Sequence, residues 1–262
     1  MINGKRVIIS LTTIPVGIPN AICAIQSILN GRVLPDKIVL YLTAEQFPNN
    51  ELPCELHDFM DKNPILEVRL YEVNIRSYTK LIPALSDFPN DIIVTIDDDI
   101  IYHKSMLKKL LIMHKIFPKA VIGHRIRCIK IGVPYKKWKR YKYHRFFTNG
   151  FRPKYSNFQT GVGGVLYPPN CLKKEMLDSS IYMKIAPTVD DVWFWAAAVA
   201  NGTKIVPVWF GCYNLVENEK PDEVCLKSVN LVRYAGVDVN RETVEKILEL
   251  YPIIKERLKN EN

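Results

Sequence analysis

The chain has 262 residues, of which 48% are hydrophobic and 24% are charged, and its net charge is +9. This composition is typical of a globular chain that can bury a core, and it excludes disordered and collagen-like proteins. The apolar runs are too short for a signal peptide or a spanning helix, so we expect a cytoplasmic protein. The six cysteines form no close pairs, so we expect neither a disulfide framework nor a zinc site.

Strand-like and helix-like segments alternate along the chain. Short runs rich in apolar residues, the first of them β-branched, predict strands at residues 7–11, 37–42, 66–71 and 92–96. Helical spacing of apolar residues predicts helices at 19–30, 78–88 and 104–117. Further on we expect a long loop at 120–154, a helix at 188–201 that Gly202 ends, and an amphipathic helix at 241–262. The alternation predicts an α/β fold around a mostly parallel central sheet, with ligands at the carboxyl ends of its strands.

Three consecutive aspartates, Asp97, Asp98 and Asp99, directly follow the most strand-like run of the chain. Their mutual repulsion would raise their pKa values unless a cation shares the site, and hard divalent cations prefer carboxylate oxygens. Since side chains alternate along a strand, we expect Asp97 and Asp99 to converge while Asp98 points away. The alternative is a polar corner in which an aspartate caps the next turn. We expect this cluster to bind a metal or a substrate.

A second acidic pair, Asp190 and Asp191, stands at the predicted start of a helix. Acidic residues favour a helix N-terminus, and Thr188 with Asp191 resembles a capping box, so a structural role is one interpretation. The other interpretation is that one of the two carboxylates acts as a general base. The glycine-rich residues 161–164 permit close packing or the close approach of a ligand, but their spacing is not that of a dinucleotide-binding loop.

The order of these motifs resembles that of a known enzyme family. The segments SLTTIP, KLIPAL, IIVTIDDDI, GVGGVLYPP and DDVWFWAAAVANGTKI together resemble the bacterial glycosyltransferases of the GT-A fold, of the family-2-like kind with a DxD motif. The resemblance runs over residues 7–208 and implies a single GT-A domain over residues 1–262. Its nucleotide-binding part would span about residues 1–100 and its acceptor side about 101–240, followed by a C-terminal helix at about 241–262.

The resemblance also implies roles for individual residues. Asp97 and Asp99 would hold Mn²⁺ or Mg²⁺ on the donor diphosphate, and Asp191, with Asp190 as its rival, would be the general base. The residues expected to contact the donor are Ser10, Thr12, Thr13, Lys80, Asp97 and Asp98. Many GT-A enzymes supply a late histidine as a further metal ligand, but no histidine follows His144 here, so a third protein ligand is not identified.

The reaction that this resemblance implies is the transfer of a hexosyl or N-acetylhexosaminyl group from a nucleotide-sugar, with UDP favoured because DxD enzymes commonly use it. The acceptor would be a glycan or a lipid-linked glycan in bacterial polysaccharide biosynthesis. We expect inversion at the anomeric carbon, because inversion needs one base and no covalent intermediate.

Basic residues dominate the middle of the chain, since no Asp or Glu occurs between Asp99 and Glu175. Within residues 130–154, aromatic residues alternate with Lys and Arg, which suits stacking on sugar rings, pairing with phosphate, or peripheral contact with the anionic inner face of a membrane. The candidates for acceptor contacts are Gly163, Gly164, Trp138 and Trp193. For Trp193 we favour the other interpretation, in which its side chain, like that of Trp195, faces the core.

Two other classes of protein remain as alternatives. The basic block together with metal-binding carboxylates would also suit a metal-dependent nucleic-acid-binding protein or nuclease, and a sugar-binding module without catalysis is a third class. No recognised nucleic-acid-binding motif is present, so we do not expect a nucleic-acid partner.

Overall fold

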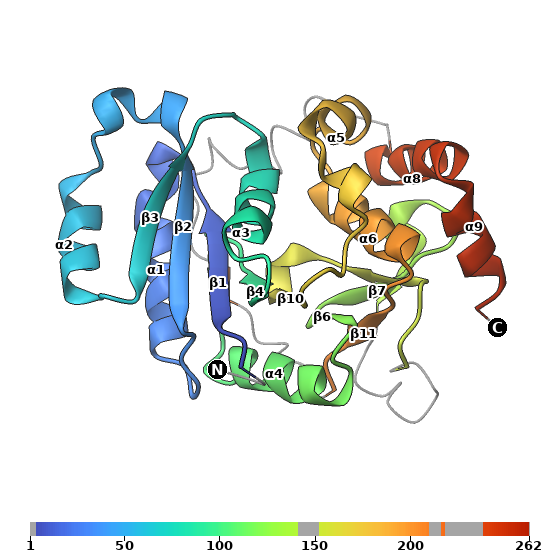
Figure 1. Cartoon of the computed structure of the whole chain (residues 1–262), viewed down its shortest axis with the longest axis horizontal. Coiled ribbons are helices and arrows are strands. Elements are labelled where there is room, and N and C mark those ends of the chain that lie inside the picture. Colours follow the sequence, from blue (N-terminus) through green and yellow to red (C-terminus); the bar gives the residue numbers. More distant parts are fainter. Residues whose placement is uncertain (1–3, 141–151, 210–215, 218–237, 262) are drawn as a thin grey trace.

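The computed structural model describes residues 4–140, 152–209, 216–217 and 238–261. At its centre lies a seven-stranded sheet in the order β11-β6-β10-β4-β1-β2-β3 (Figure 1). Its strands are β1 (Val7–Thr12), β2 (Lys37–Thr43), β3 (Leu66–Tyr71), β4 (Ile92–Thr95), β6 (Val121–Gly123), β10 (Val165–Tyr167) and β11 (Ile205–Pro207). Only β10 runs antiparallel to its neighbours, β4 and β6. The predicted α/β fold around a mostly parallel sheet is therefore confirmed.

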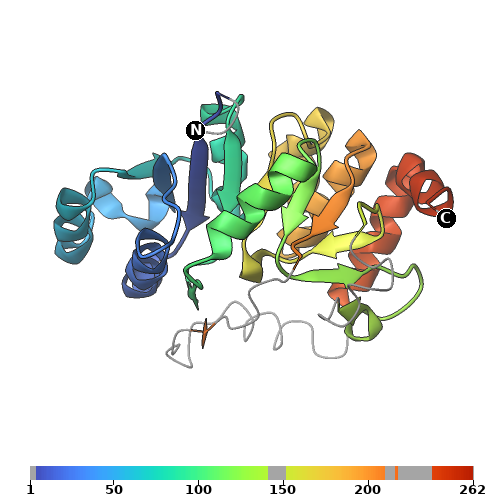
Figure 2. The same ribbon diagram turned by 90° about the horizontal axis from the view of Figure 1, so that it is seen from below.

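Helices cover both faces of this sheet (Figures 1 and 2). One face carries α1 (Ile18–Leu29), α2 (Cys54–Lys62) and α4 (Met106–Ile116), and the other carries α3 (Ile82–Asp87), α5 (Ser179–Ile185) and α6 (Asp190–Asn201). The helices α8 (Val239–Leu250) and α9 (Pro252–Lys259) pack on α6. Because side chains alternate along a strand, β1 contributes Ile8 to one core and Ile9 to the other.

The helix predicted at residues 78–88 is divided in the structure. A 3₁₀ turn, η4 (Arg76–Lys80), comes first, and α3 begins at Ile82 with Pro83 in its first turn. Proline has no N–H with which to continue a preceding helix, but it is readily accommodated where a helix starts. Lys80 therefore ends a separate turn, and it is almost completely buried there.

The start of α6 also differs from the prediction. The helix begins at Asp190 after Val189, which makes no side-chain cap, so the cap predicted at Thr188 is wrong. The other half of the expected capping box, Asp191, accepts its hydrogen bonds from a different segment instead. Gly202 ends the helix with φ +83, as predicted, because glycine adopts this left-handed conformation without strain.

The long loop predicted at residues 120–154 contains regular structure. Besides β6, the described part holds β7 (Ile126–Cys128) and β8 (Lys139–Arg140), which join β9 (Asn157–Gln159) in an antiparallel three-stranded sheet. Trp138 and Phe158 pack edge to face, with ring centroids 5.5 Å apart, and both belong to the core that also contains α6. Residues 141–151 of the predicted loop lie outside the described residues.

The C-terminal segment forms two helices in place of the one predicted at residues 241–262. α8 ends at Leu250, and α9 begins at Pro252, which cannot donate the hydrogen bond that a continuous helix would need there. A second small sheet pairs β5 (Ile100–Ile101) with β12 (Val216–Glu217). Within the described ranges, no helix is both long enough and apolar enough to cross a membrane.

Candidate active site

The carboxyl ends of β1 and β4 lie side by side, because these strands are parallel neighbours. Thr13, just after β1, donates from Oγ1 to Oδ2 of Asp98 at 2.5 Å, which ties together the segments that follow the two strands. Burial, together with the charges of Asp99 and Asp97, raises the pKa of Asp98 to about 6 despite this hydrogen bond. Strand geometry ends at Thr95, and Asp98 and Asp99 lie in a turn. The directions of these aspartates are therefore set by their contacts and not by strand alternation.

Lys80 joins the two acidic motifs that the sequence keeps far apart. Its Nζ lies 3.0 Å from Oδ1 of Asp97 and 3.0 Å from Oδ2 of Asp190, and only 8% of the residue is exposed. Ser10 fixes the backbone of this turn, since its buried hydroxyl donates to the carbonyl oxygen of Lys80 at 2.7 Å. The two carboxylates hold the pKa of Lys80 well above its usual value in spite of burial, so the side chain remains a cation.

Asp191 is held by the backbone of the glycine-rich turn η7 (Gly161–Gly163). The amide of Gly161 donates to both carboxylate oxygens of Asp191, at 3.2 and 3.0 Å. A Cβ at Gly161 would lie 2.9 Å from Nζ of Lys80 and 3.0 Å from Oδ1 of Asp97, so a larger residue would have to displace this ion pair. Burial and the charge of Asp190 raise the pKa of Asp191 to about 7, although Lys80 and the Gly161 amide act in the opposite direction. Asp191 is thus poised to accept a proton near neutral pH.

These side chains form one group, which we call the acidic cluster: Asp97, Asp98, Asp99, Asp190, Asp191 and Lys80. Asp97, Asp98, Asp99 and Asp191 all keep part of their surface accessible, so a ligand can reach them. The five carboxylates of the acidic cluster outnumber the single ammonium of Lys80. Carboxylate oxygens are the ligands that Mg²⁺ and Mn²⁺ prefer, so the residues present fit a divalent cation. Among the described residues, however, no three metal-ligating side chains are already gathered around one point.

The other residues expected at the donor or acceptor take varied positions. Thr12 is the last residue of β1 and is partly exposed. Gly163 packs against His124, where a Cβ would come within 2.8 Å of another carbon atom, and Gly164 has φ +84, so both glycines are explained by packing and backbone geometry.

The two tryptophans expected at the acceptor are core residues in the structure. Trp193 is 0% exposed and donates from Nε1 to the carbonyl oxygen of Met176, and Trp138 is 2% exposed and donates to Val133. Neither ring presents a surface to a ligand, because both pack among aromatic neighbours.

Two contributors to the site were not predicted from the sequence. Gly161 was grouped with its neighbours as a packing or ligand-approach motif, yet its amide is what orients Asp191. The hydroxyl of Tyr102 accepts a hydrogen bond from the amide of Asp97 at 2.8 Å and supports the turn that carries the aspartates. The run of glycines indicated that Gly161 could be important, whereas nothing in the sequence distinguishes Tyr102 from other core tyrosines.

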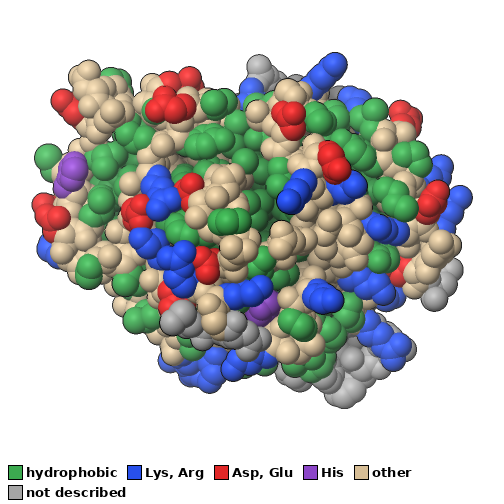
Figure 3. Space-filling model, in the orientation of Figure 1, with side chains coloured by type: hydrophobic (Ala, Val, Ile, Leu, Met, Phe, Trp, Pro, Cys, Tyr) green, Lys and Arg blue, Asp and Glu red, His purple; other side chains and the backbone are tan. Residues whose placement is uncertain are grey.

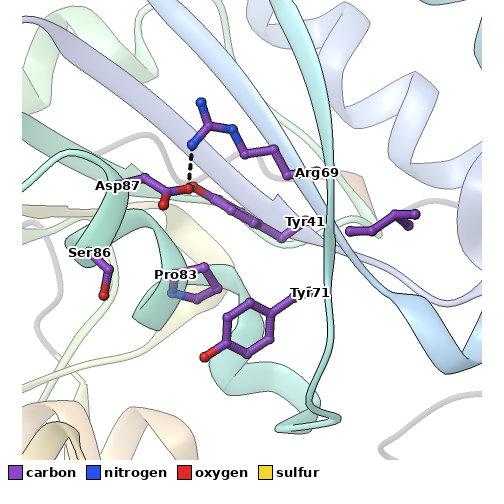
Figure 4. Close-up of a pocket in the computed structure, with 7 residues that line it drawn as sticks. Tyr41, Arg69, Tyr71, Pro83, Ser86 and Asp87 are labelled. Carbon is purple, nitrogen blue, oxygen red and sulfur yellow. Dashed lines mark hydrogen bonds and ion pairs between the residues drawn. The ribbon is translucent and has the colours of Figure 1, made fainter.

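A separate cavity of about 360 Å³ lies between α3 and strands β2 and β3 (Figure 4). It is lined by Tyr41, Arg69, Leu70, Tyr71, Pro83, Ser86 and Asp87. The carboxylate of Asp87 accepts a hydrogen bond from the Tyr41 hydroxyl at 2.7 Å and pairs with Arg69. These contacts fasten α3 to the sheet, and none of the lining residues belongs to the acidic cluster.

Comparison with known proteins identifies the fold. The sequence matches no protein-family model and no curated protein at a significant level. The structure, however, superposes on that of the mannosyltransferase PcManGT from Pyrobaculum calidifontis, which was solved in complex with GDP-Man and Mn²⁺. The TM-score is 0.57 at 13% identity, over 97% of this chain and 69% of that protein. It also superposes on two crystal structures of S. aureus TarS 1–349, one of them in complex with UDP. For each the TM-score is 0.53 at 14% identity, over 94% of this chain and 70% of that one. The chain therefore has a GT-A-like glycosyltransferase fold.

Proposed function

We propose that this protein transfers a sugar from a nucleotide-sugar donor to a hydroxyl group of a glycan or lipid-linked glycan, with inversion and with Asp191 as general base. One observation carries the proposal: Lys80 joins Asp97, which follows a strand, to Asp190, at the start of α6, with Asp191 beside them. The two acidic motifs therefore form one site at the carboxyl ends of the strands, where α/β folds bind their ligands.

The proposed reaction needs one base and one leaving group. The acceptor hydroxyl attacks the anomeric carbon, a new C–O bond forms, and the bond from that carbon to the diphosphate oxygen breaks. Asp191 takes the hydroxyl proton, and the nucleoside diphosphate leaves with the bonding electrons. The pKa of about 7 matches this role, because Asp191 is then a stronger base than an ordinary carboxylate while still ionised near neutral pH. The Gly161 amide keeps its carboxylate in one orientation.

Asp97 and Asp99 are the residues that we propose to hold a divalent cation together with the donor phosphates, and Asp98 is proposed to contact the donor. Such a cation, when bound, offsets the negative charge that develops on the departing nucleoside diphosphate. Asp97 already pairs with the Lys80 ammonium, so Lys80 supplies part of this positive charge from the chain itself. The similar fold of PcManGT, which was solved with GDP-Man and Mn²⁺, supports this part of the proposal.

The donor is proposed to be a UDP- or GDP-sugar, since TarS was solved with UDP and PcManGT with GDP-Man. Thr12 is the last residue of β1, and Thr13 follows it and contacts Asp98. Both threonines are proposed to contact the nucleoside. Ser10 is proposed to act through Lys80, because its hydroxyl is fully used in holding that backbone.

The test separates binding from transfer. Calorimetry with UDP-, GDP-, CMP- and dTDP-sugars, with and without Mn²⁺, would identify the donor for the wild-type protein and for Asp191→Asn. We expect both proteins to bind the same donor. Transfer or slow hydrolysis of that donor should fall by about 100- to 10,000-fold in Asp191→Asn, which is the usual contribution of a general base. Asp178→Asn, which changes an exposed aspartate at the start of α5, is the matched control and should keep full activity.

Two outcomes would contradict the proposal in different ways. If Asp190→Asn abolishes transfer and Asp191→Asn does not, the base is Asp190 and the assignment within the pair is wrong. If no nucleotide-sugar binds under any metal condition, glycosyl transfer itself is refuted. Metal-dependent cleavage of single-stranded DNA or RNA by the same preparation would then support the nuclease alternative.

A further inference from the structure

The outer face of α4 carries a regular stripe of basic and apolar residues. Lys108, Ile112, Lys115 and Ile116 are all exposed, and the two isoleucines expose 47% and 48% of their surface. At 3.6 residues per turn these four positions fall within an arc of about 100° on the helix. The opposite face of α4, with Leu107, Leu110, Leu111 and Met113, is buried against the sheet. The stripe is therefore not needed for packing of the helix.

The surroundings of this stripe are also basic. Lys104 precedes the helix and Lys119 follows it, and both are exposed. The sequence holds no acidic residue between Asp99 and Glu175, so α4 contains none that could neutralise its lysines along the helix. α4 forms the lower border of the molecule in Figure 1 and faces the viewer in Figure 2. Blue Lys and Arg side chains are grouped at the lower edge of the space-filling view (Figure 3).

We propose that the α4 stripe is a docking surface for an anionic lipid bilayer. Lysines near the bilayer are attracted to acidic headgroups, and the isoleucines next to them on the arc enter the boundary between headgroups and acyl chains, which is the arrangement of interfacial helices. Nucleic acid is a poorer occupant, because the stripe has no aromatic side chain to stack on a base and its isoleucines would contribute nothing to phosphate contacts.

The position of α4 connects this surface with the acidic cluster. The helix begins at Met106, whose backbone oxygen lies 3.0 Å from Nε2 of His124 and whose sulfur packs on Gly164. The glycine-rich turn that holds Asp191 thus adjoins the first turn of α4. Membrane docking does not depend on the proposed transfer reaction, but it would keep the acidic cluster close to an acceptor that is anchored in the same bilayer.

The test is co-sedimentation of the full chain with vesicles, in the absence of any sugar donor. Neutral phosphatidylcholine vesicles are compared with vesicles that contain about one third phosphatidylglycerol. We expect the wild-type protein to bind only the anionic vesicles, and less strongly as salt increases. Since each lysine near an anionic surface contributes roughly fivefold in affinity, Lys108→Glu with Lys115→Glu should weaken binding by roughly 25-fold or more. Ile112→Ser with Ile116→Ser should also weaken binding, at every salt concentration.

Two matched double variants serve as controls. Lys255→Glu with Ile253→Ser makes the same kinds of change on α9, where Glu256 gives the surface a mixed charge, and should leave vesicle binding unchanged. Lys136→Glu with Lys137→Glu alters exposed lysines in the basic segment of residues 130–154 and tests the other candidate membrane surface. All changed side chains are exposed or partly exposed, and circular dichroism would verify folding.

Three results would overturn the proposal. The first is that the wild-type protein does not bind anionic vesicles. The second is that binding is lost in the variant of residues 136 and 137 and kept in both α4 variants. The third is that single-stranded nucleic acid competes fully with the vesicles while the isoleucine substitutions have no effect, which would make α4 a phosphate-binding surface.

Discussion

Replacing Lys80 with methionine tests whether its ammonium balances the acidic cluster. The substitution keeps an unbranched side chain of similar length and removes the charge. Two unit charges 3.0 Å apart attract each other by roughly 5 kcal/mol at an effective dielectric constant of about 20, and Lys80 makes two such contacts. The cost of burying the ammonium offsets much of this gain. Breaking a buried pair from one side typically costs about 3–5 kcal/mol, which is the loss that we expect.

Urea unfolding in the presence of EDTA would measure this loss at pH 8 and at pH 5. Burial raises the pKa of Asp191 to about 7 and that of Asp98 to about 6, so both gain protons between these pH values. The uncompensated negative charge in Lys80→Met is therefore smaller at pH 5, and the loss of stability should shrink there. Millimolar Mn²⁺ should restore more stability to the variant than to the wild-type protein, because the variant has lost its own cation.

The control is Lys246→Met, which removes a charge from the exposed face of α8 and should change stability by less than about 0.5 kcal/mol. Adding Asp190→Asn to Lys80→Met should recover part of the loss, since one unpaired carboxylate is then gone. A loss below about 1 kcal/mol, or an equal loss at both pH values, would refute the idea that Lys80 balances these carboxylates.

Four further predictions follow, three for the acidic cluster and one for the separate contact of Asp87 with Tyr41. Gly161→Ala would place a Cβ 2.9 Å from Nζ of Lys80, so we expect a lower melting temperature by differential scanning fluorimetry and loss of transfer. Asp87→Ala would leave the buried hydroxyl of Tyr41 without its partner at a cost of about 1–3 kcal/mol in urea unfolding, with donor affinity unchanged in calorimetry. The rate of transfer should rise with pH and level off above about 7 as Asp191 ionises, and unchanged rates between pH 5 and 8 would contradict its role as base. Because the folded protein binds this proton more tightly than the unfolded chain, stability should fall over the same pH range, and Asp191→Asn should weaken that dependence.

Four of the seven strands of the central sheet could be predicted, because three are apolar runs that contain β-branched residues and β3 alternates apolar with charged residues. Residues 7–11, 37–42, 66–71 and 92–96 were each predicted within one residue of the observed strand ends. Short strands such as β7 and β8 could not be predicted, since they are stabilised by a distant partner, β9, and by aromatic packing beneath them. A strand of two or three residues has too few side chains to show periodicity.

The site was predictable in its residue types and less so in its contacts. Asp97, Asp190 and Lys80 were all selected from the sequence, and the contacts of Lys80 with both carboxylates bring them together, with Asp191 next in the chain. The spacing of Asp97 and Asp99 suggested strand alternation, but the strand ends before them, so the rule did not apply. The amide of Gly161 could not be identified as the partner of Asp191, because only the folded backbone determines which N–H group faces a carboxylate.

The antiparallel strand β10 has a consequence for how this protein can diverge. Val165 pairs with Thr95 on one side and with Gly123 on the other, so the chain leaves the sheet at β6 and returns at the adjacent strand. Residues 124–164 therefore form an excursion whose two ends are fixed next to each other. An insertion between β8 and β9 would leave in place both the strands of the small sheet and Gly161, whose amide orients Asp191. Each doubling of the length of a flexible loop costs only about 0.6 kcal/mol of closure entropy. Descendants of this gene can therefore change the length of the chain at that point while the contacts of the acidic cluster are kept.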